Sequence, residues 1–502
     1  MSANGFVLGI DLGTTNTAAV AYGPESPGPV SILHGRDQPV MPSVVSMKNA
    51  RLPIVGWLAK DMLLTDPLTT IYGWKRFLGR SPDSEFVARY RARFPFRIQG
   101  DDSGRLGAVV GNQVVPFVDI AAMVLDQVRL QTSAMLSRSV RDTVIAVPAH
   151  FNHAQRSAVI EAAARAGLNV MSLINEPTAA ALAFGLDQKL QSRLLVFDLG
   201  GGTFDATILE LTENVFDVKA TRGEGFLGGI DFDRAIMNRL IEYCRQTHHI
   251  DPSEEPIVAQ RLLNAAESAK RMLSAHECVD IRVPMIGMDR RGDSVDLEYR
   301  LDRRELEQLT APLVERAIGT VEEMMRESGF ERQHLQQVII SGGQSRMPLV
   351  LRRIEQALGQ APWTHLDADT CVALGAAVFA RSHEHLDGAV LLDVLSVPIG
   401  AVLPGGQTQL VFPANTSLPA QRAIAFDGRT DDRGVSIGLF QGADIAAPDR
   451  QMLGILRVPS HMLPRGERFL IELDLSEGLH LRARFRSSTQ TVPLVLEGAG
   501  AA

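Results

Sequence analysis

The sequence predicts an α/β protein of two similar lobes followed by a small all-β domain. A strand–turn–strand unit occurs twice, at Phe6–Val20 and at Leu194–Ile208, and both copies carry Asp-Leu-Gly between apolar, often β-branched residues. From Val394 onward the helical periodicity gives way to short alternating runs separated by Gly, Pro and Asp, which is the pattern of a β-sandwich. Two distant copies of one unit predict two lobes that face each other.

The bulk composition of the 502 residues is that of a globular protein with a full core. Apolar residues make up 45% and charged residues 22%, which excludes a disordered or fibrous chain. The net charge of −8 argues against general binding to nucleic acid or anionic membranes. Three cysteines without a CxxC pair predict neither disulfides nor zinc and favour a reducing compartment. With no signal-peptide pattern and no run of about 18 apolar residues, we expect a cytoplasmic protein.

Helix and strand signals alternate after each copy of the repeated unit. In the first lobe, a buried strand at Thr143–Val147 ends at Pro148, and Asn152 can cap the helix that follows. The predicted helices are 118–136, 154–166, 177–185, 257–274, 303–328 and 369–381, with a further strand at 338–341. Alternating runs at 435–440, 469–475 and 479–486 predict sandwich strands. The predicted organisation is a two-lobed domain over 1–386, an apolar linker over 387–393, the sandwich over 394–497 and a mobile tail over 498–502.

The turn of each repeated unit presents successive backbone N–H groups to one point, which suits phosphate oxygens. The two predicted cradles are formed by Gly13, Thr14 and Thr15, and by Gly200, Gly201, Gly202 and Thr203. Asp11 and Asp198 end the preceding strands, where carboxylates can hold a hydrated Mg²⁺. The alternative is a pair of tight hairpins whose glycines serve the backbone alone. Because the unit is repeated, we favour a polyphosphate held from both lobes.

Two further patterns allow more than one interpretation. Glu267, Lys270, Arg271 and Ser274 share one helix face, which fits either a ligand contact or a solvated face with local ion pairs. Gly342-Gly343, with Arg346 close behind, follows a strand. That segment is either a strand-to-helix turn or a place where the backbone approaches a flat ligand.

Taken together, these segments resemble the 70-kilodalton heat-shock protein family of chaperones (DnaK type), within the actin and sugar-kinase superfamily. The resemblance extends from about Leu8 to Leu496, with Lys75-Arg76 and the linker in place. It rests on five motifs in order: Gly9–Asn16, Ile174–Gly185, Val196–Asp205, Ser341–Pro348 and Ala373–Ala377. It implies an actin-like (ribonuclease H-like) ATPase domain joined to a substrate-binding sandwich, with ATP or ADP and Mg²⁺ as ligands.

The resemblance also implies roles for single residues in ATP hydrolysis. Asp11, Asp198 and Asp205 would surround Mg²⁺ and its waters, and Thr14, Thr15 and Thr203 would contact phosphates. Lys75 would lie beside the γ-phosphate, with Glu176 near the attacking water, in a reaction that depends on positioning and charge. The helix face of Glu267, Lys270, Arg271 and Ser274 would bracket adenosine together with Gly342, Gly343 and Arg346, and Asp369 would also line the pocket. Gln344 stands where the family usually has Ser.

A relay between cleft and linker is implied as well. Pro148 and Arg156 match the relay, although a strand-ending proline and a solvated arginine explain them equally well. Leu391, Leu392 and Asp393 match the linker, whose apolar residues favour docking in one nucleotide state. J-domain cochaperones contact the position of Asp393 in the family, but Ser172 replaces an arginine of that contact. The implied partners are unfolded client polypeptides, a J-domain cochaperone and a nucleotide exchange factor, on a monomer.

The sandwich would bind an extended apolar peptide through Ile399, Leu403, Val435 and Ile437. The alternative is that all four are ordinary core residues. The sequence ends soon after the last strand, without the helical lid of typical relatives, and we expect fast peptide exchange from such a short form.

We therefore predict an ATP-dependent chaperone. The main alternative is an ATP-switched regulator, or a recognition protein for a single client, that uses the same ATPase domain. A sugar kinase would need a catalytic base and a polar substrate pocket that the sequence does not offer. An actin-like filament protein would polymerise with ATP.

Overall fold

The computed structural model describes most of the chain. The described residues are 5–24, 26, 28–185, 192–212, 215–289, 291–382, 390–426, 434–442, 451–463, 468–488 and 491–497. Two predicted features, the boundary after residue 386 and the tail 498–502, lie outside these ranges. In the described part, no helix is both long and apolar enough to cross a membrane.

The first lobe is built on a sheet of order β12-β11-β1-β2-β3, with β4 also paired to β2. The first repeated unit is the predicted antiparallel hairpin β1–β2, and β1 runs parallel to β11 on its other side. Leu8 of β1 shares a core with Val124 of α3 and Val159 of α4. The bounds are β1 (Val7–Leu12), β2 (Asn16–Tyr22), β3 (Val30–Ser31), β4 (Val40–Pro42), β11 (Asp142–Val147), β12 (Asn169–Asn175), α3 (Phe117–Leu136) and α4 (His153–Arg165). Asn152 caps α4 as predicted, in a reciprocal capping box with Gln155.

Two small sheets and two short helices extend the first lobe. The sheets have the orders β6-β5-β7 and β10-β9-β8. Their elements are β5 (Val45–Ser46), β6 (Ile54–Val55), α1 (Trp57–Met62), β7 (Thr70–Ile71), α2 (Glu85–Tyr90), β8 (Ile98–Gly100), β9 (Leu106–Val110) and β10 (Gln113–Pro116). Short 3₁₀ helices lie at Trp74–Arg76 and Arg91–Arg93.

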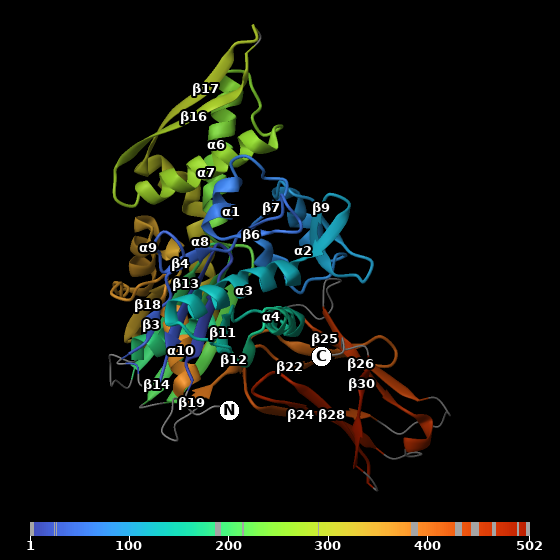
Figure 1. Ribbon diagram of the computed structural model, residues 1–502. Helices are drawn as coiled ribbons and strands as arrows, with labels where there is room; N and C mark the ends of the chain where they lie inside the picture. The colour runs from blue at the N-terminus through green and yellow to red at the C-terminus, as the bar shows by residue number, and fades with distance from the viewer. Residues whose placement is uncertain are drawn as a thin grey trace.

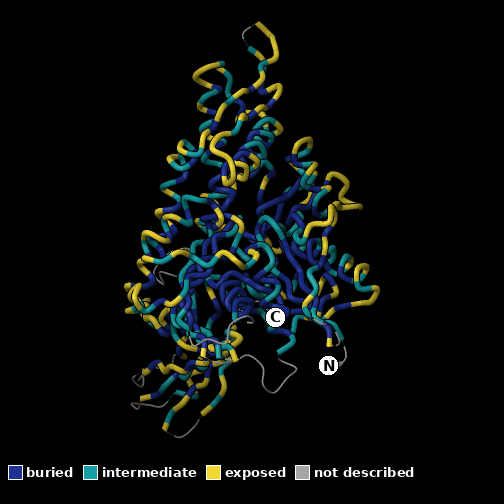
Figure 2. Tube along the Cα trace, turned by 90° about the vertical axis from the view of Figure 1, so that its left-hand side faces the viewer, coloured by how far each residue is buried: buried dark blue, intermediate teal, exposed yellow. Residues whose placement is uncertain are grey.

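The second lobe repeats the plan with a sheet of order β18-β13-β14-β15-β19. The second repeated unit is the predicted hairpin β13–β14. A long hairpin, β16–β17, projects from this lobe (Figure 1), and Figure 2 shows that exposed residues are frequent along it. The bounds are β13 (Ser192–Leu199), β14 (Phe204–Thr212), β15 (Val215–Glu224), α6 (Gly229–Thr247), α7 (Pro256–Met272), β16 (Cys278–Met288), β17 (Ser294–Asp302), α8 (Arg303–Ser328), β18 (Gln337–Ser341), α9 (Pro348–Leu358) and β19 (Val390–Leu392), with 3₁₀ helices at Arg332–His334 and Gly343–Arg346.

Helices α5 (Glu176–Gly185) and α10 (Cys371–Ser382) join the two lobes. α10 packs against β1, β2 and β11, while α5 packs against β13 and β14, and the two helices contact each other. The contact is backbone to backbone, because a Cβ atom at Gly375 would lie 1.7 Å from the Ala179 carbonyl oxygen. Glycine at position 375 is therefore required for the two helices to pack this closely.

The remaining strands form the predicted sandwich. Its sheets have the orders β22-β21-β25-β26-β30 and β24-β27-β28-β29, and a two-stranded ladder pairs β20 with β23. Ile437 and Leu439 from one sheet pack against Ile471 and Phe485 from the other. The bounds are β20 (Val394–Leu395), β21 (Ile399–Val402), β22 (Thr408–Phe412), β23 (Thr416–Ser417), β24 (Ala420–Phe426), β25 (Val435–Gln441), β26 (Gln451–Val458), β27 (Phe469–Leu475), β28 (Leu481–Arg486), β29 (Thr491–Leu494) and β30 (Leu496–Glu497), with a 3₁₀ helix at Ser460–Met462.

The sandwich is attached to both lobes (Figure 1). Strand β19 of the predicted linker runs parallel to β15 and extends the second lobe's sheet. At the first lobe, the Gln441 side chain accepts a hydrogen bond from the His153 N–H at 3.0 Å. At the second, the Thr221 N–H donates to Asn415 Oδ1 at 2.9 Å. The linker is therefore docked in this structure.

Candidate functional site

The two lobes enclose a cleft with an empty volume of about 1400 Å³, including the open solvent at its mouth. A space of this size admits a nucleotide. The wall contains nearly all the residues predicted to bind one, namely Asp11, Gly13, Thr14, Thr15, Lys75, Glu176, Asp198, Gly200, Gly201, Gly202, Thr203, Glu267, Lys270, Arg271, Gly342, Gly343, Arg346 and Asp369. Motifs that are far apart in the sequence thus converge on one site.

The two glycine-rich turns pack directly against each other in this cleft. A Cβ atom added to Gly201 would lie 1.9 Å from Thr15 Oγ1, and one added to Gly202 would lie 2.4 Å from the Thr14 side chain. No larger residue fits at either position while the turns stay in place. Thr15 Oγ1 is buried without a hydrogen-bond partner in the described structure, so it is available to an incoming phosphate oxygen.

Arg76 holds the second turn from the side of the first lobe. Its buried Nε donates to the Gly202 carbonyl oxygen at 3.0 Å, and its guanidinium pairs with Asp231 near the start of α6. The guanidinium carbon also lies 3.8 Å from the centre of the Phe226 ring. Because a buried guanidinium must be paired, these contacts fix the position of the second cradle relative to the first lobe.

Buried carboxylates gather beside the cradles. The pKa of Asp11 is raised to about 7, first by burial and then by the charge of Glu176, while Lys75 opposes the shift. The pKa of Asp198 is raised well above its ordinary value, first by burial and then by Glu176 and Asp205. Such mutual repulsion favours a cation between the carboxylates.

The donor set fits Mg²⁺ held through water and phosphate. In the described part of the chain, no three His, Cys, Asp or Glu side chains are close enough to coordinate a metal ion directly. Mg²⁺ on nucleotide phosphates needs no such cage, because it keeps several waters and takes one or two carboxylates. Asp11 and Asp198 would supply these.

Lys75 and Glu176 form a buried ion pair in the cleft. Lys75 belongs to the 3₁₀ helix Trp74–Arg76, Glu176 begins α5, and the Nζ and Oε1 atoms are 2.6 Å apart. Their side chains are only 2% and 8% exposed. The pKa of Glu176 is raised by burial, with Lys75 opposing the shift and Asp205 adding to it. A cation and a carboxylate thus meet in the wall of the cleft.

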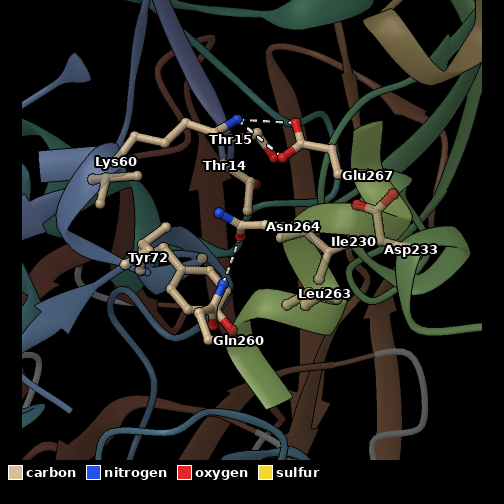
Figure 3. A pocket seen from close by; sticks show the side chains of 13 residues that line it. Thr14, Thr15, Lys60, Tyr72, Ile230, Asp233, Gln260, Leu263, Asn264 and Glu267 are labelled. Carbon is tan, nitrogen blue, oxygen red and sulfur yellow. Dashed lines mark hydrogen bonds and ion pairs between the residues drawn. The ribbon is translucent and has the colours of Figure 1, made fainter. Parts of the chain in front are cut away.

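The predicted face of α7 lines the opposite part of the cleft. Lys270 is buried, its Nζ lies 2.8 Å from Asp233 Oδ1, and it donates to the Gly229 carbonyl oxygen at 3.0 Å. Glu267 pairs with Lys60 of the first lobe at 2.9 Å. Figure 3 shows this cross-lobe pair in the wall of a smaller pocket, which Tyr72 also lines. The interpretation of Glu267 and Lys270 as a solvated face is therefore wrong.

The turn at Gly342-Gly343 is the predicted strand-to-helix turn, and it lines the cleft. It leads from β18 into a 3₁₀ helix. Gly342 has φ 78°, and a Cβ atom added there would lie only 2.5 Å from the Leu199 backbone. Arg346 is paired with Asp369 at 3.0 Å and with Asp367 at 2.7 Å. The turn therefore brings backbone and a guanidinium to the cleft wall.

Two predicted residues lie outside this wall. α7 ends at Met272, so Ser274 falls in the turn beyond the helix and is exposed. Asp205 is only 1% exposed and lies behind the wall, where its Oδ1 is 2.9 Å from His150 Nδ1. Ser274 therefore does not continue the helix face of Glu267 and Lys270, and its contact with adenosine stays a prediction.

One of the two predicted relay residues, Arg156, is connected to the linker by hydrogen bonds. Pro148 follows β11, and Arg156 on α4 donates to Asn175 Oδ1 at 2.5 Å. Asn175 in turn donates to Asp393 Oδ2 at 2.7 Å. Burial raises the pKa of Asp393, and Arg156 opposes the shift. Asn175 immediately precedes Glu176, so one chain of contacts connects the cleft with the linker.

The linker and the predicted peptide positions differ in exposure. Leu391 packs against the core between the lobes, whereas Leu392 is 40% exposed. In the sandwich, Ile399, Val435 and Ile437 are buried in the common core, and Leu403 is partly buried beside it. Their role in peptide binding stays a prediction.

Sequence reasoning missed several residues of the site. The sequence indicates no role for Lys60, Asp233 or His150, and Asn175 falls within the motif Ile174–Gly185 without a role of its own. Only Asn175 carried a signal, because it adjoins Glu176 in a strand-to-helix turn. The others depend on contacts between distant segments, which spacing along the chain does not reveal.

The fold and the site define an actin-like ATPase domain joined to a β-sandwich. The Hsp70 protein family model matches residues 7–472. Two chaperone proteins DnaK, from two strains of Thermus thermophilus, are 37% and 36% identical to the chain over 498 residues. Each alignment covers 98% of this chain and 80% of the relative. The chain belongs to the Hsp70 family, which makes it an ATPase and supports an ATP-dependent chaperone function.

Proposed function

We propose that the protein is an ATP-dependent chaperone that captures and releases extended apolar peptide segments. The observation that carries this proposal is the connection from Glu176 through Asn175 to Asp393 and the docked strand β19. A cleft that changes on hydrolysis would act on the linker, and through it on the sandwich. By linkage, ATP and peptide must then change each other's affinity by the same factor.

The residues of the cleft fit separate roles in ATP hydrolysis. Mg²⁺, when bound, neutralises charge on the β- and γ-phosphates. Lys75 would hold the γ-phosphate, Thr203 would contact it, and Glu176 would orient the attacking water. The raised pKa of Glu176, caused first by burial, reflects how strongly this position disfavours an uncompensated charge.

The partners and the compartment belong to the same proposal. We place the protein in a reducing, cytoplasmic compartment because Cys244, Cys278 and Cys371 are free thiols. A J-domain cochaperone would meet the protein near Asp393, with Ser172 altering the contact, and an exchange factor would act on the cleft. We propose a monomer that binds neither nucleic acid nor membranes.

Single-turnover ATP hydrolysis tests the proposal. The rate is measured with Mg²⁺, with and without a panel of extended apolar peptides. We expect slow hydrolysis that peptides accelerate and that falls by about a hundred-fold in Lys75→Ala, because the variant loses the cation beside the γ-phosphate. Hydrolysis that no peptide changes would leave the ATPase but remove the chaperone cycle.

A further inference from the structure

His150 contacts Asp205, one of the carboxylates predicted to act in ATP hydrolysis, although His150 itself has no predicted role. It lies two residues after Pro148, and its Nδ1 is 2.9 Å from Asp205 Oδ1. The imidazole is 15% exposed and the Asp205 side chain 1% exposed. Among the described residues, His150 is the only side-chain hydrogen-bond partner of Asp205.

The hydrogen-bond chemistry defines the tautomer of His150. A carboxylate oxygen only accepts, so the Nδ1 atom carries the hydrogen and donates it to Asp205. The other ring nitrogen, Nε2, and the second carboxylate oxygen, Asp205 Oδ2, are buried without partners in the described structure. One hydrogen bond therefore determines how the Asp205 carboxylate is turned.

The neighbouring strand β15 leaves space for this pair. Gly223 lies opposite Asp205 in the β14–β15 register. A Cβ atom at Gly223 would be 2.4 Å from Asp205 Oδ1 and 2.7 Å from His150 Nδ1. A glycine inside a strand weakens the strand and marks a place where another group approaches the backbone closely. Here the approaching groups are the Asp205 carboxylate and the His150 ring.

We propose that His150 is a positioning residue for ATP hydrolysis, a role that rests on the proposed ATPase function. Its Nδ1–H fixes the orientation of the Asp205 carboxylate. The charge of this carboxylate acts on both Glu176 and Arg156. Burial is the first cause of the pKa shift at each, raising the value at Glu176 and lowering it at Arg156, and the Asp205 carboxylate raises the pKa at both. A carboxylate free to turn would no longer hold this charge in one place.

Three substitutions in the full chain separate this role from simple packing. His150→Asn keeps an N–H donor near the position of Nδ1, His150→Gln moves the donor toward Nε2, and His150→Leu has none. We expect His150→Leu and His150→Gln to slow single-turnover hydrolysis about ten-fold, with the Kd for ATP unchanged within about two-fold. His150→Asn recovers hydrolysis to within about three-fold of the unaltered chain.

A double-mutant cycle with Asp205→Ala tests whether His150 acts through Asp205. In that background we expect His150→Leu to change the rate by less than about two-fold. Equal rates in the Asn and Gln variants, or an additive cycle, would overturn the proposal. If the unaltered chain hydrolyses ATP and Lys75→Ala does not, the ATPase stands whatever the His150 variants show; if neither hydrolyses ATP, both proposals fall together.

Discussion

The interlobe cleft and the β-sandwich bury their predicted functional residues in different ways. The cleft buries charged groups beside an open volume, as with Lys75 and Glu176 at 2% and 8% exposure. The sandwich buries apolar groups against one another, and Ile437 is fully enclosed in its core. Buried charges need a partner or a ligand, whereas a buried isoleucine is fully explained by the core. Burial of a predicted residue therefore supports a functional role in the cleft. In the sandwich it does not distinguish a peptide contact from an ordinary core residue.

The largest expected effect comes from adding a methyl group at the point where the two glycine-rich turns of the cleft meet. In Gly201→Ala, the new methyl group would lie 1.9 Å from Thr15 Oγ1. The turns must move apart, and we expect ATP affinity to fall by about a hundred-fold, since the loss of one or two hydrogen bonds to a charged phosphate, at about 1.5–3 kcal/mol each, has this effect. Isothermal titration with ATP and Mg²⁺ measures the change.

Gly319→Ala on α8 is the matched control. No heavy atom lies within 4 Å of the added methyl group there, so ATP affinity should stay unchanged while the helix gains about 0.5–1 kcal/mol of stability. Unchanged ATP binding in Gly201→Ala would show that the two turns do not form the nucleotide site.

Two substitutions in the sandwich distinguish a peptide-binding groove from an ordinary hydrophobic core. Ile437→Ala should lower the free energy of unfolding by about 2–5 kcal/mol, because Ile437 is 0% exposed. The partly buried Leu403 should affect stability less, and Leu403→Ala should weaken binding of an apolar peptide. Denaturant unfolding and fluorescence anisotropy measure the two quantities.

Leu410→Ala, at a 51% exposed leucine of β22, provides the control for leucine truncation on this domain. It should change neither stability nor peptide affinity appreciably. If Leu403→Ala behaves in the same way, the predicted peptide contact at Leu403 is wrong.

The same contrast explains how much could be predicted from the sequence. The hairpins β1–β2 and β13–β14, and helices α3, α4, α7 and α8, follow from local periodicity, caps and glycines. The two glycine-rich turns could be placed from the sequence because Gly13 and Gly201 stand at fixed places between two apolar strands, while their binding of phosphate stays a prediction. Repetition of the unit then indicated two lobes.

The rest depends on contacts that cross between segments. The cross-lobe pair of Lys60 with Glu267 and the His150–Asp205 hydrogen bond join residues far apart in the sequence. Periodicity also does not show where a helix ends, so the helix predicted to run to residue 274 stops at Met272. In the sandwich, alternation identifies the buried face of a strand but is the same for a core and for a groove.

The smallest expected effect concerns the interface that joins the two regions. His153 begins α4, and its N–H is bonded to Gln441 of the sandwich. Its pKa is lowered from the ordinary 6.5, first by burial and then by the positive charges of His480, from the sandwich, and Arg156. The docked arrangement therefore favours the neutral imidazole. Its contribution to docking is complete above about pH 6.5 and is lost as the pH falls below that value.

Fluorescence energy transfer between the first lobe and the sandwich, followed from about pH 7.5 to about pH 5.5, measures this effect. We expect a decrease of a few-fold in the docked population on acidification, because the protonated His153 would then place a positive charge near that of Arg156. His153→Gln removes the titrating group of α4 and should flatten the response, while leaving the backbone bond to Gln441 in place. A full response in that variant would assign the pH dependence to another group. Docking that strengthens as the pH falls would contradict this prediction, because the interface would then stabilise the protonated imidazole of His153.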